Sequence, residues 1–222
     1  KYFPSIPHKR LKEIICSHIV DDRIKLLIED IIEGYHTKPA FLDKYDIPYR
    51  GNGDLTGRGI PIGNQTSQIF GMFYLNKVDR LVKEKLRIKV YSRYMDDFLL
   101  LHEDKEYVKH ALEEIVKVVE YLGLKFNSKT QIIPIKNGIT YLGFRFIITP
   151  TGKIIRTVKK VTKKRMRSRA KILKKAYLDG TIPIERVQAS LAAFHGHLNG
   201  SDSNNFEQEL KRKLTFKTEE EK

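Results

Sequence analysis

Residues 88–101 read IKVYSRYMDDFLLL and place two adjacent acidic residues between two short apolar runs. We predict an antiparallel strand pair, Ile88–Ser92 and Phe98–Leu101, with Asp96 and Asp97 near its turn. Adjacent carboxylates repel, and side chains alternate across a strand, so both cannot point into one core. A tight turn removes this conflict because it places at least one carboxylate at the exposed end of the sheet.

The acidic pair also predicts a metal site. Hard divalent cations such as Mg²⁺ prefer carboxylate oxygens and usually bridge to phosphates. Two such ions about 3.5–4 Å apart can activate an attacking hydroxyl and stabilise a leaving oxygen. The alternative is a solvated Asp-Asp turn, but the aromatic-x-Asp-Asp string inside an apolar hairpin favours the metal site. We therefore predict that Asp96 and Asp97 are catalytic ligands of two Mg²⁺ ions, with Mn²⁺ as the alternative ion.

Composition limits the class of protein. The chain has 222 residues with 41% hydrophobic content, enough for one sizeable domain or two small ones. Its net charge of +15 indicates a polyanionic partner, either nucleic acid or an anionic membrane surface. A membrane span is excluded because no run of about eighteen apolar residues exists. The single cysteine, Cys16, excludes an internal disulfide and is expected to be a buried structural thiol. These features favour a cytoplasmic protein that handles nucleic acid.

Apolar periodicity predicts most of the helices. The pattern from Pro7 to Gly34 is helical and is expected to break at Asp21-Asp22, where an aspartate can cap the second helix. Thr66–Leu86 reads as one further helix. A third, amphipathic helix is expected to begin after Asp104 and to end at Gly123.

The later part of the chain carries two turn signals. Asn137-Gly138 lies between the predicted strands Gln131–Ile135 and Ile139–Ile148 and predicts a hairpin. Pro150-Thr151-Gly152 predicts a second reversal. Beyond it, residues 153–175 and Pro183–Asn199 are expected to be helices.

These patterns predict an α+β domain over residues 1–150, with an antiparallel sheet backed by helices, and a small basic helical module over residues 151–222. Residues 153–175 contain twelve Lys or Arg and no acidic residue. Like charges one turn apart oppose helix formation, and a polyanion along the helix would offset that cost. A solvated charged face is the weaker alternative. The predicted nucleic-acid-binding residues are Lys163, Lys164, Arg165 and Arg167.

Four segments together resemble the motifs of reverse transcriptases, in the order that this family has them. Tyr94-Met95-Asp96-Asp97 resembles catalytic motif C, and residues 59–68, GIPIGNQTSQ, resemble motif B. Asn127-Ser128-Lys129-Thr130 resembles motif D, and residues 141–146, YLGFRF, resemble motif E, the primer grip. The resemblance implies a right-hand palm, a helical thumb and RNA-directed DNA polymerase activity. The implied partners are an RNA template, a DNA or RNA primer duplex and dNTPs.

The resemblance also implies roles for individual residues. Lys129 would act as a general acid toward the leaving pyrophosphate, although a surface lysine without a role is nearly as good an interpretation. Phe3 would be the steric gate beneath the sugar of a dNTP, with Tyr2 as the fallback. The remaining implied nucleotide-binding residues are Ile62, Gly63 and Gln68, and the implied primer grip comprises Tyr141, Leu142 and Gly143.

One expected part of the family pattern is missing. The chain opens Lys1-Tyr2-Phe3, which resembles the end of motif A, so the motif A aspartate would lie about three residues before Lys1. The fingers that precede motif A are missing too. The chain is therefore expected to be a fragment that does not catalyse by itself. The alternative from another class is a non-catalytic palm that only binds nucleic acid.

Motif B also indicates a subfamily. Group II intron enzymes typically have Gln before the glycine and Pro after the serine, whereas Ile62 and Gln68 occupy these positions here. This pattern resembles the reverse transcriptases of diversity-generating retroelements, which copy a template repeat with errors at adenines. A group II intron type remains the alternative, and a small basic accessory protein is a further candidate partner. His195-Gly196-His197 is not expected to bind zinc, since no Cys or acidic ligand lies nearby.

Overall fold

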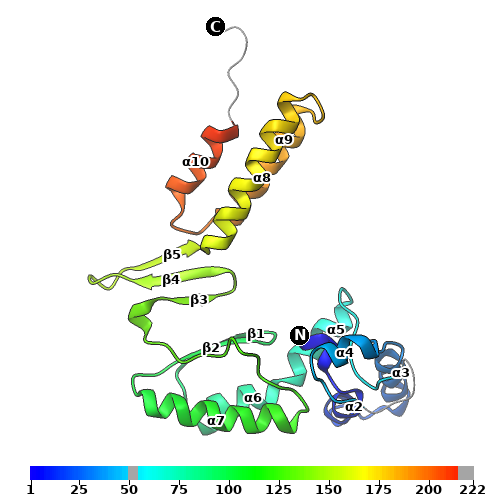
Figure 1. Cartoon of the computed structure of the whole chain (residues 1–222). Helices are drawn as coiled ribbons and strands as arrows, with labels where there is room; N and C mark the ends of the chain where they lie inside the picture. Colours follow the sequence, from blue (N-terminus) through cyan, green and yellow to red (C-terminus); the bar gives the residue numbers. More distant parts are fainter. Residues whose placement is uncertain (50–54, 215–222) are drawn as a thin grey trace, which may run out of the picture. The chain divides into compact units, whose positions relative to one another are not determined.

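The computed structural model describes residues 1–49 and 55–214, which form helices and small antiparallel sheets (Figure 1). This content is consistent with the predicted α+β class. The chain divides into two units, Lys1–Ile132 and Ile133–Lys222. The sequence placed a boundary near residue 150 instead, and the assignment of palm and thumb stays a prediction. Residues 215–222 of the predicted thumb lie outside the described residues.

The first unit contains most of the helices. They are α1 (Tyr2–Ser5), α2 (His8–Cys16), α3 (Asp22–Glu33), α4 (Pro39–Lys44), α5 (Gln65–Tyr74), α6 (Asn76–Arg80), the π-helix η1 (Leu81–Lys85) and α7 (Lys105–Tyr121). The two predicted aspartate caps are confirmed. Asp21 accepts a hydrogen bond of 2.8 Å from the backbone N–H of Arg23, and Asp104 accepts one of 2.8 Å from that of Glu106.

The predicted single helix over Thr66–Leu86 is wrong, because the segment forms α5, α6 and η1 in succession. The chain leaves α5 at Leu75, whose φ of −93° and ψ of 8° lie outside the helical range. Leu75, Val78 and Val82 are nevertheless all buried. Apolar spacing therefore continues across the break, which is why periodicity did not reveal it.

A two-stranded antiparallel sheet follows, made of β1 (Val90–Tyr94) and β2 (Asp97–Leu101). The predicted strand pair is confirmed, with β1 beginning two residues later than expected. The register pairs Tyr94 with Asp97 and Val90 with Leu101, so the loop between the strands has two residues.

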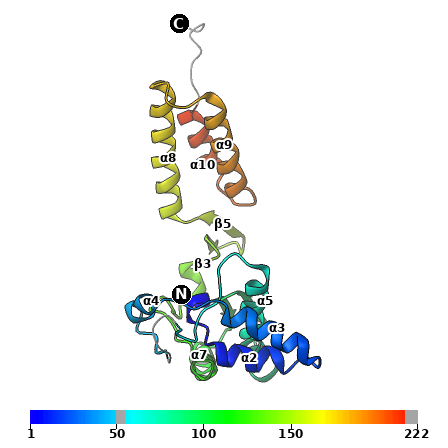
Figure 2. The ribbon, with the colours of Figure 1, turned by 90° about the vertical axis from the view of Figure 1, so that its right-hand side faces the viewer.

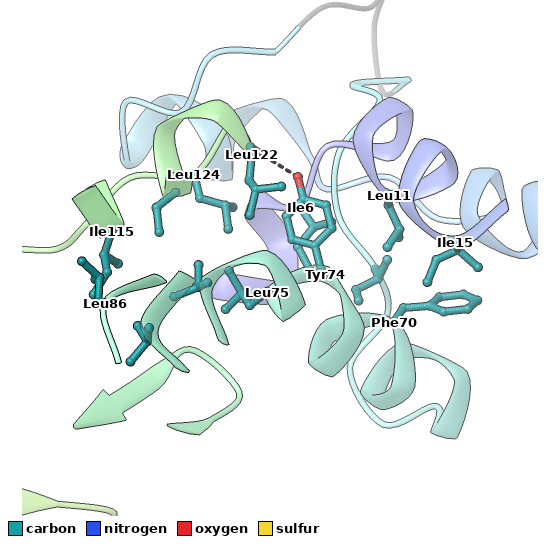
Figure 3. Packing of buried hydrophobic residues seen from close by; sticks show 14 of the residues in the cluster. Ile6, Leu11, Ile15, Phe70, Tyr74, Leu75, Leu86, Ile115, Leu122 and Leu124 are labelled. Carbon is teal, nitrogen blue, oxygen red and sulfur yellow. Dashed lines mark hydrogen bonds between the residues drawn. The ribbon is translucent and has the colours of Figure 1, made fainter. Parts of the chain in front are cut away.

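Figure 3 shows the hydrophobic core of the first unit. Buried side chains from α2, α5, α6 and α7 meet there, and the fully buried Tyr74 donates its hydroxyl hydrogen to the carbonyl oxygen of Leu122. Ile6, from the segment after α1, belongs to the same core. The N-terminal segment and α5, which begins within motif B, are thus packed into one body. Cys16 is only half-buried, so the expected fully buried thiol is not found.

The second unit combines a three-stranded antiparallel sheet with three helices. Its elements are β3 (Ile139–Tyr141), β4 (Phe144–Ile148), β5 (Ile154–Val158), α8 (Lys160–Leu178), α9 (Ile184–Leu198) and α10 (Asn204–Leu214). The helices lie side by side in Figures 1 and 2 and bury Met166, Ala170, Phe194, Phe206 and Leu210 between them.

The predicted Asn137-Gly138 hairpin is wrong. Residues 131–134 are not a strand, and Ile135–Asn137 form a 3₁₀ turn, η2, ahead of β3. Pro134 lacks the N–H that a strand partner needs, which argues against a strand there. The hairpin turn is instead Leu142-Gly143, which divides the predicted strand Ile139–Ile148 into β3 and β4.

The reversal at Pro150-Thr151-Gly152 is confirmed by the antiparallel pairing of β4 with β5. The prediction that residues 153–175 are all helical is wrong at its start, because Ile154–Val158 form β5. Ile154, Ile155 and Val158 have the branched side chains typical of strands, a signal that the high charge of the segment obscured. Within the described residues, none of the helices combines the length and the apolar character needed to cross a membrane.

Candidate active site

The hairpin between β1 and β2 positions the acidic pair. Since Tyr94 pairs with Asp97, the two central residues of the turn are Met95 and Asp96. Met95 has a φ of +54°, in the left-handed region that favours glycine. Such a conformation costs of order 1–3 kcal/mol and persists only where surrounding contacts hold it. The turn thus displays Asp96 and Asp97 at the exposed end of the sheet, as the sequence predicted.

A pocket of about 250 Å³ opens beside this turn. It brings together five of the predicted site residues, which come from three separate segments of the first unit. Its lining residues are Lys1, Tyr2, Phe3, Pro4, Ile62, Tyr94, Met95, Asp96 and Asp97. The N-terminal segment, motif B and motif C therefore meet at one place.

The electrostatics of the pocket suit a cation. Both carboxylates are exposed by surface area, yet the surrounding protein partly desolvates Asp96 and raises its pKa above the ordinary value of 3.8. The neighbouring charge of Asp97 raises the Asp96 pKa further. A bound cation would offset both effects. Across residues 1–49 and 55–214, no group of three or more His, Cys, Asp or Glu could hold a metal ion. Two carboxylates still fit Mg²⁺, which is commonly bound by one or two carboxylates together with substrate phosphates.

Tyr2 and Phe3 also line the pocket and are anchored to α5. The Tyr2 hydroxyl donates a hydrogen bond of 2.5 Å to the carbonyl oxygen of Gly71. The Phe3 ring lies against the same glycine, where an added Cβ would be 2.4 Å from Phe3 Cε1. Only glycine therefore leaves room for the ring in this position.

The predicted motif B residues are only partly at the pocket. Ile62 lines it, with 77% of the residue exposed. Gly63 has a φ of +107°, which explains the need for glycine, although an added Cβ would meet no atom within 4 Å. Gln68 lies in α5, where its backbone N–H donates to the carbonyl oxygen of Asn64. Neither Gly63 nor Gln68 lines the pocket.

The motif D and motif E residues do not line the pocket either. Lys129 is exposed, and its backbone N–H donates a hydrogen bond of 2.8 Å to Asn127 Oδ1. Tyr141 ends β3 in the second unit, and Leu142 and Gly143 form the following turn with φ values of +46° and +87°. This turn again places a non-glycine residue in the left-handed region, with Leu142 44% exposed.

The four predicted nucleic-acid-binding residues of α8 fall into two pairs. Lys164 and Arg165 are exposed. Arg167 is also exposed, but it forms a bidentate ion pair with Glu209 of α10, with N–O distances of 2.8 and 2.7 Å. Lys163 Nζ lies 5.3 Å from the centre of the Phe206 ring. Lys163 and Arg167 thus stabilise the packing of α8 on α10.

Sequence reasoning missed three residues near the pocket. Lys1 lines it directly, and Gly71 contacts both Tyr2 and Phe3. Arg93 contacts the turn itself, through the carbonyl oxygen of Met95.

Comparison with known proteins agrees with the motifs. A family model described as "Reverse transcriptase (RNA-dependent DNA polymerase)" matches residues 1–146. The match covers more than half of the chain, so the protein belongs to the reverse transcriptase family. Enzymes of this family are nucleotidyltransferases that use a nucleic-acid template and primer, dNTPs and divalent metal ions. No curated protein matches the chain.

The contact of Phe3 with Gly71 predicts opposite effects for two glycine substitutions. Gly71→Ala should lower the free energy of unfolding by about 1–3 kcal/mol, because the new methyl group displaces the Phe3 ring. Gly196→Ala is the matched control, since Gly196 lies in α9 with nothing within 4 Å of an added Cβ. This change should stabilise its helix by up to about 1 kcal/mol. Urea unfolding followed by circular dichroism measures both, and equal effects would contradict the packing described.

The raised pKa of Asp96 predicts a stability cost at neutral pH. The pKa of this carboxyl group is higher in the folded than in the unfolded protein. The free energy of unfolding therefore falls as pH rises from the unfolded pKa through the folded pKa. Without metal, Asp96→Asn should therefore be more stable than wild type at pH 7. This advantage should shrink as pH falls toward 3.8. Asp30→Asn, on the exposed part of α3, is the control and should change stability little. Unfolding curves across this pH range test the sign; a destabilised Asp96→Asn at pH 7 would contradict it.

Proposed function

We propose that this chain is the palm and thumb portion of an RNA-directed DNA polymerase of retroelement type, which adds dNTPs to a primer by two-metal phosphoryl transfer. The observation that carries the proposal is the pocket, which Asp96 and Asp97 line together with Phe3 and Ile62 from distant segments. The family match supplies the class of reaction. Residues 1–150 would be the palm and residues 151–222 the thumb.

In this proposal each pocket residue has a distinct role. Asp96 and Asp97 would hold divalent ions, Mg²⁺ or Mn²⁺, which when bound activate the primer hydroxyl and neutralise the phosphates. Phe3, fixed against Gly71, would lie beneath the sugar and exclude a 2′-hydroxyl. Ile62 would contact the nascent base pair, with Gly63 and Gln68 shaping the loop and helix behind it. Lys129 would protonate the leaving pyrophosphate.

The reaction needs more than the carboxylates of this pocket. Two close divalent ions bring four positive charges, which two carboxylates only half offset. We therefore expect residues 1–222 by themselves not to extend a primer, and a third carboxylate to be required in the active protein. A non-catalytic nucleic-acid-binding palm is the competing function, because no larger acidic cluster exists in the described part of the chain.

Primer extension on an RNA template tests the proposed reaction. In the protein as its gene encodes it, extension should require Mg²⁺ or Mn²⁺, and Asp96→Asn should reduce it by more than about 100-fold. Loss of groups that only support metal ligands already costs about 10–100-fold. Asp30→Asn, an exposed aspartate of α3, is the matched control and should retain full activity.

Two outcomes would contradict this assignment. Near-normal extension by Asp96→Asn would remove the metal role from the turn. A gene-encoded protein that binds template and primer but never extends them would favour the non-catalytic palm instead.

The exposed basic residues of α8 support a second part of the proposal, that the thumb binds the template–primer duplex. The exposed basic side chains of this helix include Lys164, Arg165, Lys171 and Lys175. Such contacts to phosphates give affinity that falls steeply with salt and carries no sequence preference. Arg167 is not expected to contact the duplex, because its guanidinium forms an ion pair with Glu209.

The salt dependence of duplex binding tests this role of α8. Replacing Lys164, Arg165, Lys171 and Lys175 with Gln should reduce the slope of log affinity against log salt by about 1–4, at roughly 0.9 per lost phosphate contact. Replacing Lys105, Lys109 and Lys117 of α7 with Gln is a control for loss of charge elsewhere, and should change the slope little. Equal changes in both sets would contradict a duplex site on α8.

The subfamily proposal rests on Ile62. We place the protein with the reverse transcriptases of diversity-generating retroelements, and a small basic accessory protein would be a partner. Ile62 is exposed in the pocket and carries no hydrogen-bonding group, unlike the Gln typical of group II enzymes. One hydrogen bond is worth about 0.5–1.5 kcal/mol, and about 1.4 kcal/mol is tenfold in selectivity. Its absence would therefore relax base selection up to about tenfold.

Error rates on a defined RNA template test this proposal. Ile62→Gln in the gene-encoded protein should lower misincorporation several-fold, and Ile62→Val should leave it near wild type because Val also lacks a hydrogen-bonding group. Sequencing of the cDNA gives both values, and wild-type errors should fall mainly opposite adenine. An unchanged error spectrum in Ile62→Gln would exclude Ile62, and faithful copying by wild type would exclude the subfamily.

A further inference from the structure

Arg93 connects the carboxylate turn to two helices of the first unit. It lies in β1, one residue before Tyr94, and only 11% of its side chain is exposed. Its Nη1 donates a hydrogen bond of 3.0 Å to the carbonyl oxygen of Met95, and its Nη2 donates one of 3.0 Å to that of Met72. Its Nε donates one of 2.7 Å to Asp79 Oδ1. Every nitrogen of the guanidinium group is therefore used, toward the β1–β2 turn, α5 and α6.

The bond to Met95 acts on the strained part of the site. Met95 holds a φ of +54° between Tyr94 and Asp96. A conformation of this kind persists only where neighbouring contacts determine it. Since Asp96 follows Met95 directly, rotation of the Met95–Asp96 peptide would redirect the first carboxylate. The Arg93 hydrogen bond opposes that rotation.

The bond to Met72 acts on the end of α5. Met72 belongs to the last turn of this helix, which ends at Tyr74, and the last carbonyls of a helix lack partners within it. A positive charge at a helix C-terminus is favourable as well. The carbonyl oxygen of the preceding residue, Gly71, accepts a hydrogen bond from the Tyr2 hydroxyl. The same turn of α5 therefore holds the N-terminal side of the pocket through Tyr2 and the carboxylate side through Arg93.

Asp79 of α6 completes the arrangement. It forms an ion pair with Arg93 and accepts a hydrogen bond of 2.8 Å from the Tyr91 hydroxyl. Burial and this contact with Asp79 raise the pKa of Tyr91, so the hydroxyl stays protonated and donates. A largely buried guanidinium is costly unless it is paired and hydrogen-bonded, and here both conditions are met.

We propose that Arg93 is a positioning residue that fixes the Asp96-Asp97 turn relative to α5, and through α5 relative to Tyr2 and Phe3. This inference rests on the proposed function of Asp96 and Asp97. It requires the planar fork of arginine, because one ammonium group cannot reach Asp79, Met72 and Met95 in these directions at once. Arg93→Lys therefore keeps the charge and the pairing with Asp79 but releases the two carbonyls.

The test compares Arg93→Lys with Arg80→Lys in the protein as its gene encodes it. Arg80 lies on α6 and forms an exposed ion pair with Glu84, so Arg80→Lys makes the same chemical change away from the pocket. Mn²⁺ binding is titrated by electron paramagnetic resonance with a chain-terminated primer, an RNA template and the next dNTP present. Primer extension gives kcat and KM for the dNTP, and circular dichroism gives the melting temperature.

We expect Arg93→Lys to fold, to bind Mn²⁺ about 10–100-fold more weakly and to lose kcat by a similar factor, with a smaller change in KM. Tyr91→Phe removes only the hydrogen bond to Asp79, so it should lower Mn²⁺ affinity and kcat by a smaller factor than Arg93→Lys. Arg80→Lys should match wild type in every measurement.

The outcomes separate this inference from the proposed function. If Arg93→Lys only melts at a lower temperature, with wild-type Mn²⁺ affinity and kcat, its role is structural and the inference is wrong. If Arg93→Lys equals Arg80→Lys throughout, the inference is wrong as well. If the wild-type protein neither binds Mn²⁺ nor extends a primer, the proposed function of Asp96 and Asp97 is wrong, and the inference that rests on it is wrong with it.

Discussion

The repulsion between two adjacent carboxylates is the constraint on which the site depends. A two-residue turn places Asp96 and Asp97 at the exposed end of a sheet, with Met95 in a backbone region that favours glycine. Partial burial and, to a smaller extent, the neighbouring charge of Asp97 raise the pKa of Asp96. The rest of the first unit supports this turn: α6 supplies Asp79 as the partner of Arg93, and α5 supplies the Met72 carbonyl. A cation at the turn would remove the remaining repulsion.

Local chemistry made much of the first unit predictable from sequence. Asp21 and Asp104 could be assigned as caps because a capping carboxylate acts on backbone groups two or three residues away. The β1–β2 hairpin followed from apolar runs on both sides of a polar turn. The break at Leu75 could not be predicted, because the buried spacing continues through it. The Leu142-Gly143 turn was missed for another reason: Asn137-Gly138 is the stronger turn signal, but it precedes a strand instead of joining two.

The site itself was predictable only in part. Resemblance to family motifs selected Phe3, Ile62 and the acidic pair, and the pocket brings these residues together from three segments. Gly71 and Arg93 gave no comparable signal, because their importance lies in contacts with residues more than twenty positions away or across a strand turn. The family match supports the general reaction, while the individual roles remain proposals. Of the four described non-glycine residues at positive φ, Met95 and Leu142 fall within motifs proposed to act on the primer terminus, whereas Asp46 and Arg87 do not.

The central claim is that Asp96 and Asp97 bind the catalytic cations beside Phe3 and Ile62. The most direct measurement is anomalous X-ray scattering from crystals of the gene-encoded protein grown with Mn²⁺, an RNA template, a chain-terminated primer and the next dNTP. We predict anomalous density within coordination distance of both carboxylates, with the dNTP sugar against Phe3. Density at another acidic group, with the turn at Asp96-Asp97 facing only solvent, would contradict the account.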